Sequence, residues 1–323
     1  MKIVSFLLVV MFVTQVHAQN LPRLNFGAVS PFVNSSLSQI SPRDTSGIVR
    51  ADTAIPVPVT GRVPYPKVYN VNFWTDGIIT MGGVGVSLLA LPGERNKDRI
   101  SPGEFQSLDR NLLNPFDRWA LNIQTSNIST FETYSTYTQF ITALLPVSLF
   151  FTDRIKDDWA NIFLMYLEAN SVAVTIYVAT PLGPLFQNKY RPIVYHDELS
   201  QGDRSSGNNR NSFYSGHVAS ATTATFFMAK VYCDYHPELG CDKYWLYAAA
   251  MVPPLVMSYL RLKAYDHFPS DLVVGMGVGA LVGIMVPELH HVGGKDISLG
   301  LFSSPTKGTG LTMQWEAPVE EAH

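Results

Sequence analysis

Residues 261–271 read Arg-Leu-Lys-Ala-Tyr-Asp-His-Phe-Pro-Ser-Asp, and an apolar run follows them as far as Val286. A proline at or near the first helical position predicts that a helix begins at Pro269. His267 and Asp271 are four residues apart, so in a helical turn the carboxylate would reach one imidazole nitrogen and leave the other free to attack. The stretch therefore predicts a helix start that carries a nucleophile and the group that orients it.

The chain contains five further apolar runs of helical length. Together with the run that begins at Pro269, they predict an all-α protein, a bundle of about six core helices. The five runs are 71–91, 137–151, 159–180, 217–232 and 244–260.

The two ends of the chain differ from this central part. Residues 1–18 predict a signal peptide, because Lys2 precedes an apolar stretch and small residues before Gln19 offer a cleavage site. Residues 19–70 are rich in Pro, Ser, Asn and Thr and predict an extended or disordered arm, followed by a helical domain over 71–292. Residues 293–323 predict a tail in which alternating apolar residues favour a β-hairpin.

Two more short motifs stand where helix ends are expected. Ser-Gly-His at 215–217 precedes a helical run, so its backbone N–H groups would face an anion at a helix N-terminus. Lys-Tyr-Arg-Pro at 189–192 adds basic groups. Arg191 and Arg261 lie in a region otherwise poor in charge, and buried charges need a partner. A multiply charged anion such as phosphate is the partner that these residue types favour.

Phosphoryl transfer would use each of these groups. The imidazole of His267 would attack phosphorus to form a phosphohistidine, and His217 would protonate the leaving oxygen and later activate water. Arg191 and Arg261 would hold the non-bridging oxygens, whose charge needs stabilisation during transfer.

Arg-Pro, then Ser-Gly-His, then Arg-x5-His-x3-Asp, in this order, resembles the type 2 phosphatidic acid phosphatase superfamily, which also contains bacterial class A acid phosphatases and vanadium haloperoxidases. The resemblance covers roughly residues 130–290, and the third motif is its most specific part. It implies a metal-independent phosphomonoesterase in which His267 is the nucleophile, His217 the general acid and Asp271 the support of His267. The phosphate ligands that it implies are Arg191, Ser215, Gly216 and Arg261.

The sequence departs from the family pattern at three positions. The family usually has a Lys seven residues before the Arg-Pro arginine, where this chain has Pro184. Tyr214 replaces a Pro before Ser-Gly-His, and Leu260 replaces a Ser before the third-motif arginine. Lys189 is the nearby candidate to replace the missing cation as a phosphate ligand, although its spacing differs. The alternatives are weaker binding, a smaller ester, or an inactive anion binder.

The composition excludes some partners and leaves the location open. Net charge is −3 without a long Lys/Arg cluster, which argues against nucleic acid. Hydrophobic residues make up 46% of the chain and mean hydropathy is +0.09, on the border between soluble and membrane proteins. Several runs are shorter than the about 20 residues that a span needs. We therefore expect an exported protein, periplasmic or membrane-associated.

The cysteines and a few other polar residues call for structural interpretations. Cys233 and Cys241 flank a Pro/Gly turn, and in an oxidising compartment a disulfide is favoured over two free thiols. No metal site is predicted: His290 and His291 point different ways on a helix and indicate a solvated helix end, and Glu168 is interpreted as structural.

The favoured function is a phosphatase that hydrolyses a phosphate monoester, a lipid phosphate or diphosphate rather than a sugar or nucleotide phosphate. No cofactor is expected. The alternatives are a vanadium-dependent haloperoxidase, with vanadate held by the same residues, and an inactive anion- or lipid-binding protein.

Overall fold

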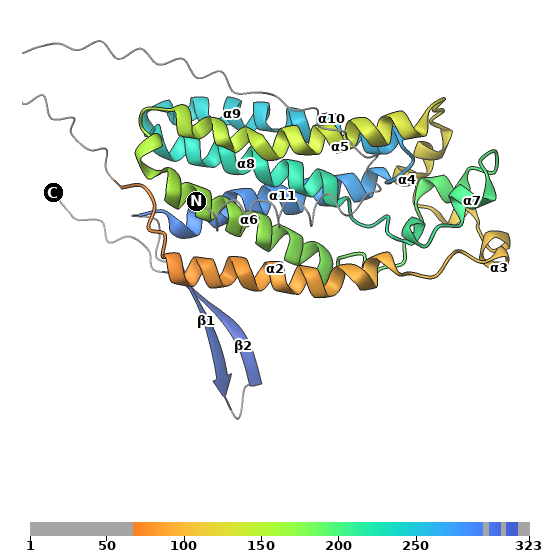
Figure 1. The fold of residues 1–323 in the computed structure, drawn as a ribbon, viewed down its shortest axis with the longest axis horizontal. Coiled ribbons are helices and arrows are strands. Elements are labelled where there is room, and N and C mark those ends of the chain that lie inside the picture. Colours follow the sequence, from red (N-terminus) through yellow and green to blue (C-terminus); the bar gives the residue numbers. More distant parts are fainter. Residues whose placement is uncertain (1–66, 293–296, 305–307, 316–323) are drawn as a thin grey trace, which may run out of the picture. The chain divides into compact units, whose positions relative to one another are not determined.

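The computed structural model describes residues 67–292, 297–304 and 308–315. The predicted signal peptide and nearly all of the predicted arm therefore lie outside the described residues. The described residues are mainly helical, which confirms the all-α class (Figure 1).

The long helices are α2 (Phe73–Arg95), α5 (Ile128–Leu144), α6 (Trp159–Ala179), α8 (Gly216–Tyr235), α9 (Lys243–Ala250), α10 (Val252–Lys263) and α11 (Pro269–His290). Shorter α-helices are α3 (Pro102–Gln106), α4 (Pro115–Arg118) and α7 (Gln201–Arg204). The 3₁₀ helices are η1 (Arg110–Leu112), η2 (Trp119–Asn122), η3 (Leu145–Phe151), η4 (Lys156–Asp158), η5 (Pro192–Tyr195), η6 (Gly207–Arg210) and η7 (Pro237–Asp242).

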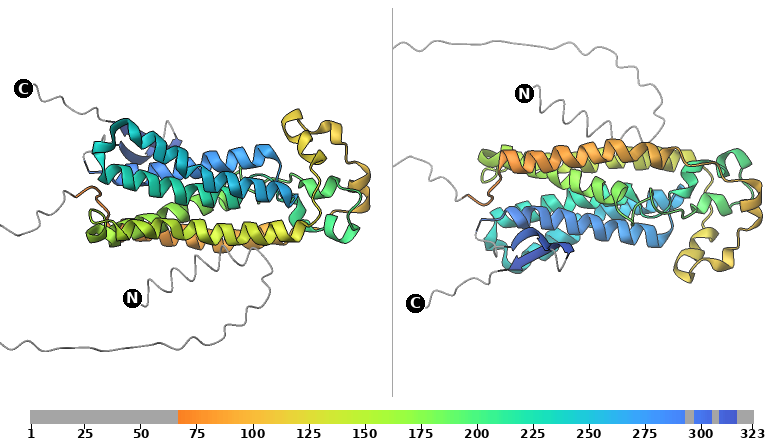
Figure 2. Two further views of the ribbon diagram at one scale, coloured as in Figure 1. Left: turned by 90° about the horizontal axis from the view of Figure 1, so that it is seen from above. Right: turned by 90° about the horizontal axis from the view of Figure 1, so that it is seen from below.

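Helix α8 is the centre of the bundle. It contacts α5, α6, α9, α10 and α11, and most of its side chains are buried. Helix α2 packs mainly on α6, and α5 on α10. Both views in Figure 2 show the long helices running alongside one another, with the short helices α3, α4 and α7 gathered at one end.

Small residues let α11 approach α8 closely. A Cβ on Gly275, Gly279 or Gly283 would lie 2.7, 2.3 or 2.7 Å from a backbone oxygen of α8 or of the residue that precedes it. Gly277, on another face, would meet nothing within 4 Å. The i, i+4, i+8 spacing therefore brings the start of α11 against the start of α8.

At one end of the bundle, three connections between long helices contact one another: α2 to α5, α6 to α8, and α10 to α11. Lys97, just after α2, donates to the backbone oxygens of Pro184 and Gln187 at 2.5 Å each. The hydroxyl of Tyr265, in the turn between α10 and α11, donates to the backbone oxygen of Ile123 at 2.7 Å. The motif-bearing segments all belong to this end.

Two strands follow the helices. β1 (Ile297–Ser304) and β2 (Gly308–Trp315) pair antiparallel, with Ile297 opposite Trp315 and Ser304 opposite Gly308.

The predicted disulfide is wrong. Cys233 is buried within α8, whereas Cys241 is exposed in η7, and both thiols are free. Helix α8 continues for two residues beyond Cys233, so this cysteine is a buried helical residue, whereas Cys241 is exposed in η7.

Three described helices, α2, α6 and α11, are long and apolar enough to cross a membrane. In α2 only 22% of the most apolar 18-residue stretch is buried, and large side chains such as Trp74 and Leu89 are exposed along the helix. An apolar surface of this kind on a helix needs a non-aqueous partner. These helices support membrane association, whereas export remains a prediction.

Candidate active site

Two helix starts meet at the end of the bundle described above. Helix α8 begins at Gly216 after Ser215, and α11 begins at Pro269. The backbone N–H of Ser215 donates to the backbone oxygen of Asp271 at 3.1 Å, which joins the two first turns. Gly216 and His217 are partly exposed, although Ser215 before them is buried. Helix starts favour negative charge through their N–H groups and dipole. At the start of α11 this negative charge comes from the protein itself, because the N–H of Ser270 donates to Asp117 Oδ1 at 2.8 Å.

The two predicted arginines share one carboxylate. Arg191 Nη1 lies 2.6 Å from Asp266 Oδ1, and Arg261 Nη1 lies 2.9 Å from Asp266 Oδ2. Arg261 also donates to Ser135 Oγ at 3.2 Å. Both guanidinium groups are buried and share the Asp266 carboxylate in a low-dielectric setting, and Glu132 and Glu94 interact with them from farther away. Each guanidinium group has more N–H donors than Asp266 can accept, which suits a bound anion.

His267 is oriented by a backbone oxygen, which corrects the expected contact with Asp271. Its Nδ1 lies 2.6 Å from the backbone oxygen of Ser212. A carbonyl oxygen only accepts, so Nδ1 carries the proton and Nε2 keeps a lone pair. Asp271 instead accepts from the Ser212 hydroxyl at 2.6 Å and from the backbone N–H of Phe268 at 2.9 Å. The Asp271 carboxylate therefore supports the His267 imidazole indirectly, through Ser212. The same carboxylate caps the start of α11.

Both imidazoles lie in the field of the two arginines. Burial lowers the pKa of His267 well below its ordinary value, and the charges of Arg261 and Arg191 lower it further. The same causes, in the same order, lower the pKa of His217. The charge of His217 also acts on the pKa of His267. The two rings and two guanidinium groups thus share one electrostatic environment, in which both rings are neutral near pH 7.

Lys189, predicted as a phosphate ligand, is held by carboxylates. Its Nζ lies 2.8 Å from Asp117 Oδ2, 2.8 Å from Asp271 Oδ1 and 2.9 Å from Ser270 Oγ. Burial raises the pKa of Asp117, but hydrogen bonds from Lys189 and Ser270 outweigh it and lower that pKa below its usual value. Lys189 therefore ties α11 to α4.

Four buried polar groups in the motif segments have no hydrogen-bond partner among the described residues, and all four carry a hydrogen that can be donated. Buried polar groups in native proteins are nearly always paired, so an unpaired set of donors indicates a ligand with acceptor oxygens. They are Arg191 Nε, Arg261 Nε, Ser215 Oγ and the Tyr214 hydroxyl.

Sequence reasoning missed Asp266, Ser212 and Asp117. Asp266 stands directly before His267 and five residues after Arg261. A carboxylate so close in sequence to these basic residues was the signal that could have identified it. Ser212 and Asp117 carried no such signal, because the imidazole that Ser212 supports lies 55 positions away and the lysine that Asp117 binds lies 72 positions away.

Comparison with known proteins agrees with the motif resemblance. A family model described as PAP2 superfamily matches residues 163–293, from α6 to just past α11, and all three motifs lie inside this segment. The resemblance to this superfamily is therefore confirmed for that part of the chain.

The crystal structure of the first transmembrane PAP2 type phosphatidylglycerolphosphate phosphatase from Bacillus subtilis is similar to 66% of this chain and 94% of its own. Sequence identity is 16% and the TM-score is 0.36. No curated protein matches this chain.

Proposed function

We propose that the protein is a phosphatase that hydrolyses a phosphate monoester through a phosphohistidine on His267. The observation that carries the proposal is the unpaired set of buried donors on Arg191, Arg261, Ser215 and Tyr214. A phosphate group supplies several acceptor oxygens and negative charge, so it would satisfy these donors and pair with the two guanidinium groups.

The reaction has two steps. In the first, the Nε2 lone pair of His267 attacks phosphorus, the P–O bond to the leaving group breaks, and His217 donates a proton to the departing oxygen. In the second, His217 takes a proton from water, the water oxygen attacks phosphorus, and the P–N bond breaks to release inorganic phosphate. Arg191 and Arg261 hold the non-bridging oxygens in both steps.

His217 must be protonated to act as the acid, although burial and the arginines lower its pKa in the free protein. A bound phosphate dianion would offset the two guanidinium charges, and the pKa of His217 would then rise. Substrate binding therefore favours the protonated form of His217, the general acid. Before the substrate binds, the charges of the two arginines keep His267 neutral and nucleophilic.

Asp271 and Lys189 act as positioning residues in this proposal. Asp271 holds Ser212, whose backbone oxygen sets the tautomer of His267. Lys189 neutralises Asp271 and Asp117 and so keeps negative charge away from the phosphate. The Lys that the family usually has at the position of Pro184 is thus not replaced by Lys189 as a direct ligand.

The favoured substrate is a lipid phosphate or lipid diphosphate. Helices α2 and α6 end, and α11 begins, at the end of the bundle that carries the site. If these helices span a membrane, the site lies where the headgroup of a lipid is found. A headgroup phosphate could then reach the arginines while its chains stay among the apolar side chains of the helices.

The test is phosphate release by the purified full chain in the presence of a metal chelator. A lipid phosphate, a lipid diphosphate and an aryl phosphate are compared. We expect release without added metal, fastest with the lipids, and a fall of at least about a thousandfold in kcat for His267→Ala. His236→Gln is the matched control, because this imidazole lies beyond the end of α8.

The intermediate gives a second readout. Acid-labile phosphate on the quenched wild-type protein, absent from His267→Ala, is the expected result. Full activity of His267→Ala would contradict the mechanism. Phosphate binding without hydrolysis of any ester would select an inactive binder, and peroxide-driven bromide oxidation only after vanadate loading would select the haloperoxidase.

A further inference from the structure

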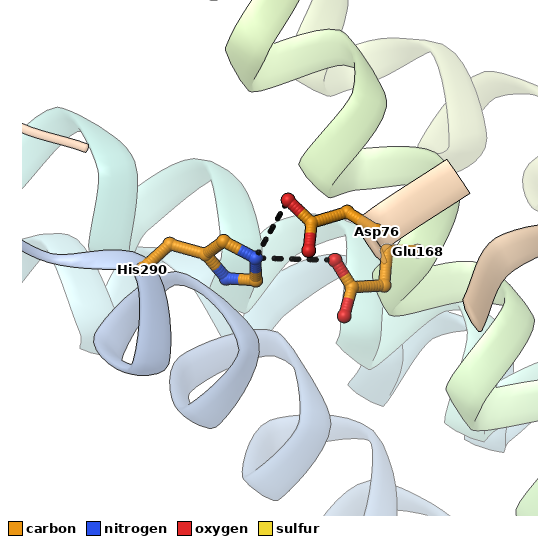
Figure 3. Close-up of side chains that lie close together, drawn as sticks. All are labelled: Asp76, Glu168 and His290. Carbon is orange, nitrogen blue, oxygen red and sulfur yellow. Dashed lines mark ion pairs between the residues drawn. The ribbon is translucent and has the colours of Figure 1, made fainter. Parts of the chain in front are cut away.

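A second cluster of ionisable side chains lies far from the phosphate site. Asp76 from α2, Glu168 from α6 and His290 from α11 converge (Figure 3). His290 Nε2 lies 3.3 Å from Glu168 Oε2 and 3.4 Å from Asp76 Oδ2. His290 lies nineteen positions beyond Asp271 in α11, which corresponds to about 29 Å at 1.5 Å per residue. The cluster is therefore independent of the proposed catalytic residues.

The orientation of His290 is set by its other nitrogen. Nδ1 lies 2.8 Å from the backbone oxygen of Val286, which can only accept, so Nδ1 carries a proton. In the neutral ring Nε2 then presents a lone pair toward the two carboxylates. Three electron-rich atoms facing one another repel unless a positive charge lies between them. A backbone oxygen that holds Nδ1 while Nε2 faces carboxylates is the arrangement typical of a metal-binding histidine.

The distances fit an ion better than direct hydrogen bonds. A charge-assisted N–H···O bond is about 2.7–2.9 Å long, shorter than the 3.3 and 3.4 Å seen here. Ligand atoms about 2.05 Å from a tetrahedral ion lie about 3.3 Å apart. The three ligand atoms also lie within 4.8 Å of one another, as a common ion requires.

Glu168 supplies an independent indication of a ligand. The residue is only 6% exposed, and its Oε2, the atom that faces His290, has no hydrogen-bond partner among the described residues. A buried carboxylate oxygen that accepts no hydrogen bond is costly in free energy. Asp76 is held in place, because its Oδ2 accepts from the backbone N–H of Asn72 at 2.7 Å.

We propose that Asp76, Glu168 and His290 bind one divalent transition-metal ion, with zinc the best match. One imidazole and two carboxylates suit zinc, whereas magnesium prefers oxygen ligands alone. Two carboxylates balance the charge of the ion. The site ties α2, α6 and α11 together and revises the expectation of no metal, without giving the ion a part in the chemistry at His267.

The site also changes the interpretation of the His-His pair at the end of α11. His290 does not mark a solvated helix end, because its side chain points between helices. His291 instead packs edge-on against Tyr69, with ring centroids 5.9 Å apart. The two neighbouring imidazoles thus offer a matched pair of variants.

The experiment uses the purified full chain without a histidine tag, stripped with a chelator and then titrated with Zn²⁺ or Co²⁺. We expect about one tightly bound equivalent by elemental analysis. The Co²⁺ spectrum should lack a thiolate charge-transfer band, which separates this site from the free cysteines. His290→Gln and Glu168→Gln should each weaken binding by about a hundredfold or more, whereas His291→Gln should bind like the wild type.

Phosphatase activity and helical content show whether the variants fold. No Co²⁺ binding by the stripped wild type would overturn the proposal, and so would binding that His290→Gln and Glu168→Gln leave unchanged. If the helices of one variant fail to form, the other variant and the wild-type spectrum decide. If the cluster is metal-free and His290 is an imidazolium, the stripped wild type will bind no Co²⁺.

Discussion

Asp266→Asn tests whether Arg191 and Arg261 form an anion site or only a structural ion pair. The substitution removes the negative charge that lies 2.6 and 2.9 Å from the two guanidinium groups and keeps the size of the side chain. Arg191 and Arg261 are 9% and 3% exposed, so water cannot replace the lost partner. Two buried positive charges would then lose the one carboxylate that both of them contact directly.

The expected loss of stability is large. Breaking a buried ion pair from one side costs about 3–5 kcal/mol in the free energy of unfolding. For a domain of this size that corresponds to a fall of about 6–20 °C in Tm. Asp197→Asn is the matched control, because Asp197 pairs with Arg204 but its side chain is 80% exposed. An exposed pair contributes at most about 1 kcal/mol.

Phosphate should restore what Asp266→Asn removes. A ligand at a hundredfold excess over its Kd stabilises the folded state by about 2.7 kcal/mol. Because phosphate would also replace the missing carboxylate charge, we expect a larger rise in Tm for the variant than for the wild type. Thermal unfolding followed by circular dichroism, with and without phosphate, measures both effects. A variant that loses stability but gains no more from phosphate than the wild type would refute the anion site.

Three further predictions concern positioning, pH and packing. Ser212→Ala removes the hydrogen bond from the Ser212 hydroxyl to the Asp271 carboxylate. It should lower kcat about tenfold with KM unchanged, which corresponds to about 1.4 kcal/mol in the activation free energy. The folded state keeps His217 and His267 neutral at pH values where the unfolded chain takes up protons. The free energy of unfolding should therefore fall as pH drops below about 6.5, the ordinary pKa, by up to about 1.4 kcal/mol per pH unit for each ring. Tm should fall with it in a pH series of melts, and His267→Asn should flatten that dependence. Gly279→Ala would place a Cβ 2.3 Å from a backbone oxygen and should cost about 1–3 kcal/mol by denaturant unfolding, while Gly277→Ala, with open space around it, should be neutral or slightly stabilising. Equal stability of the two glycine variants would contradict the close contact of α8 and α11.

We propose different roles for the two ends of the bundle. One carries the arginines and imidazoles proposed for phosphate chemistry, and the other carries the proposed metal ligands of α2, α6 and α11. Metal binding and phosphate release are measured separately, so each proposal stands or fails independently of the other.

Local sequence was sufficient for the helical class and for the order of the three motifs. Apolar runs of helical length and a proline before Asp271 are short-range signals, because helix formation depends on residues a few positions apart. The same short range explains two failures. His267 and Asp271 are four residues apart, yet His267 Nδ1 donates to the backbone oxygen of Ser212. Asp271 is already bound by the backbone N–H of Phe268, the Ser212 hydroxyl and Lys189. Cys233 and Cys241 are close in sequence, but helix packing buries one thiol and exposes the other.

Residue type and spacing alone led to the prediction that two arginines, two imidazoles and a Ser-Gly turn serve phosphate chemistry. Which carboxylate each cation meets depended on the packing of helices. Asp266 lies between arginines that are 70 positions apart, and Glu168 reaches His290 across the contact of α6 with α11. Such pairings follow from close approach at glycines and from the need to pair every buried charge, neither of which is encoded in the spacing of neighbouring residues.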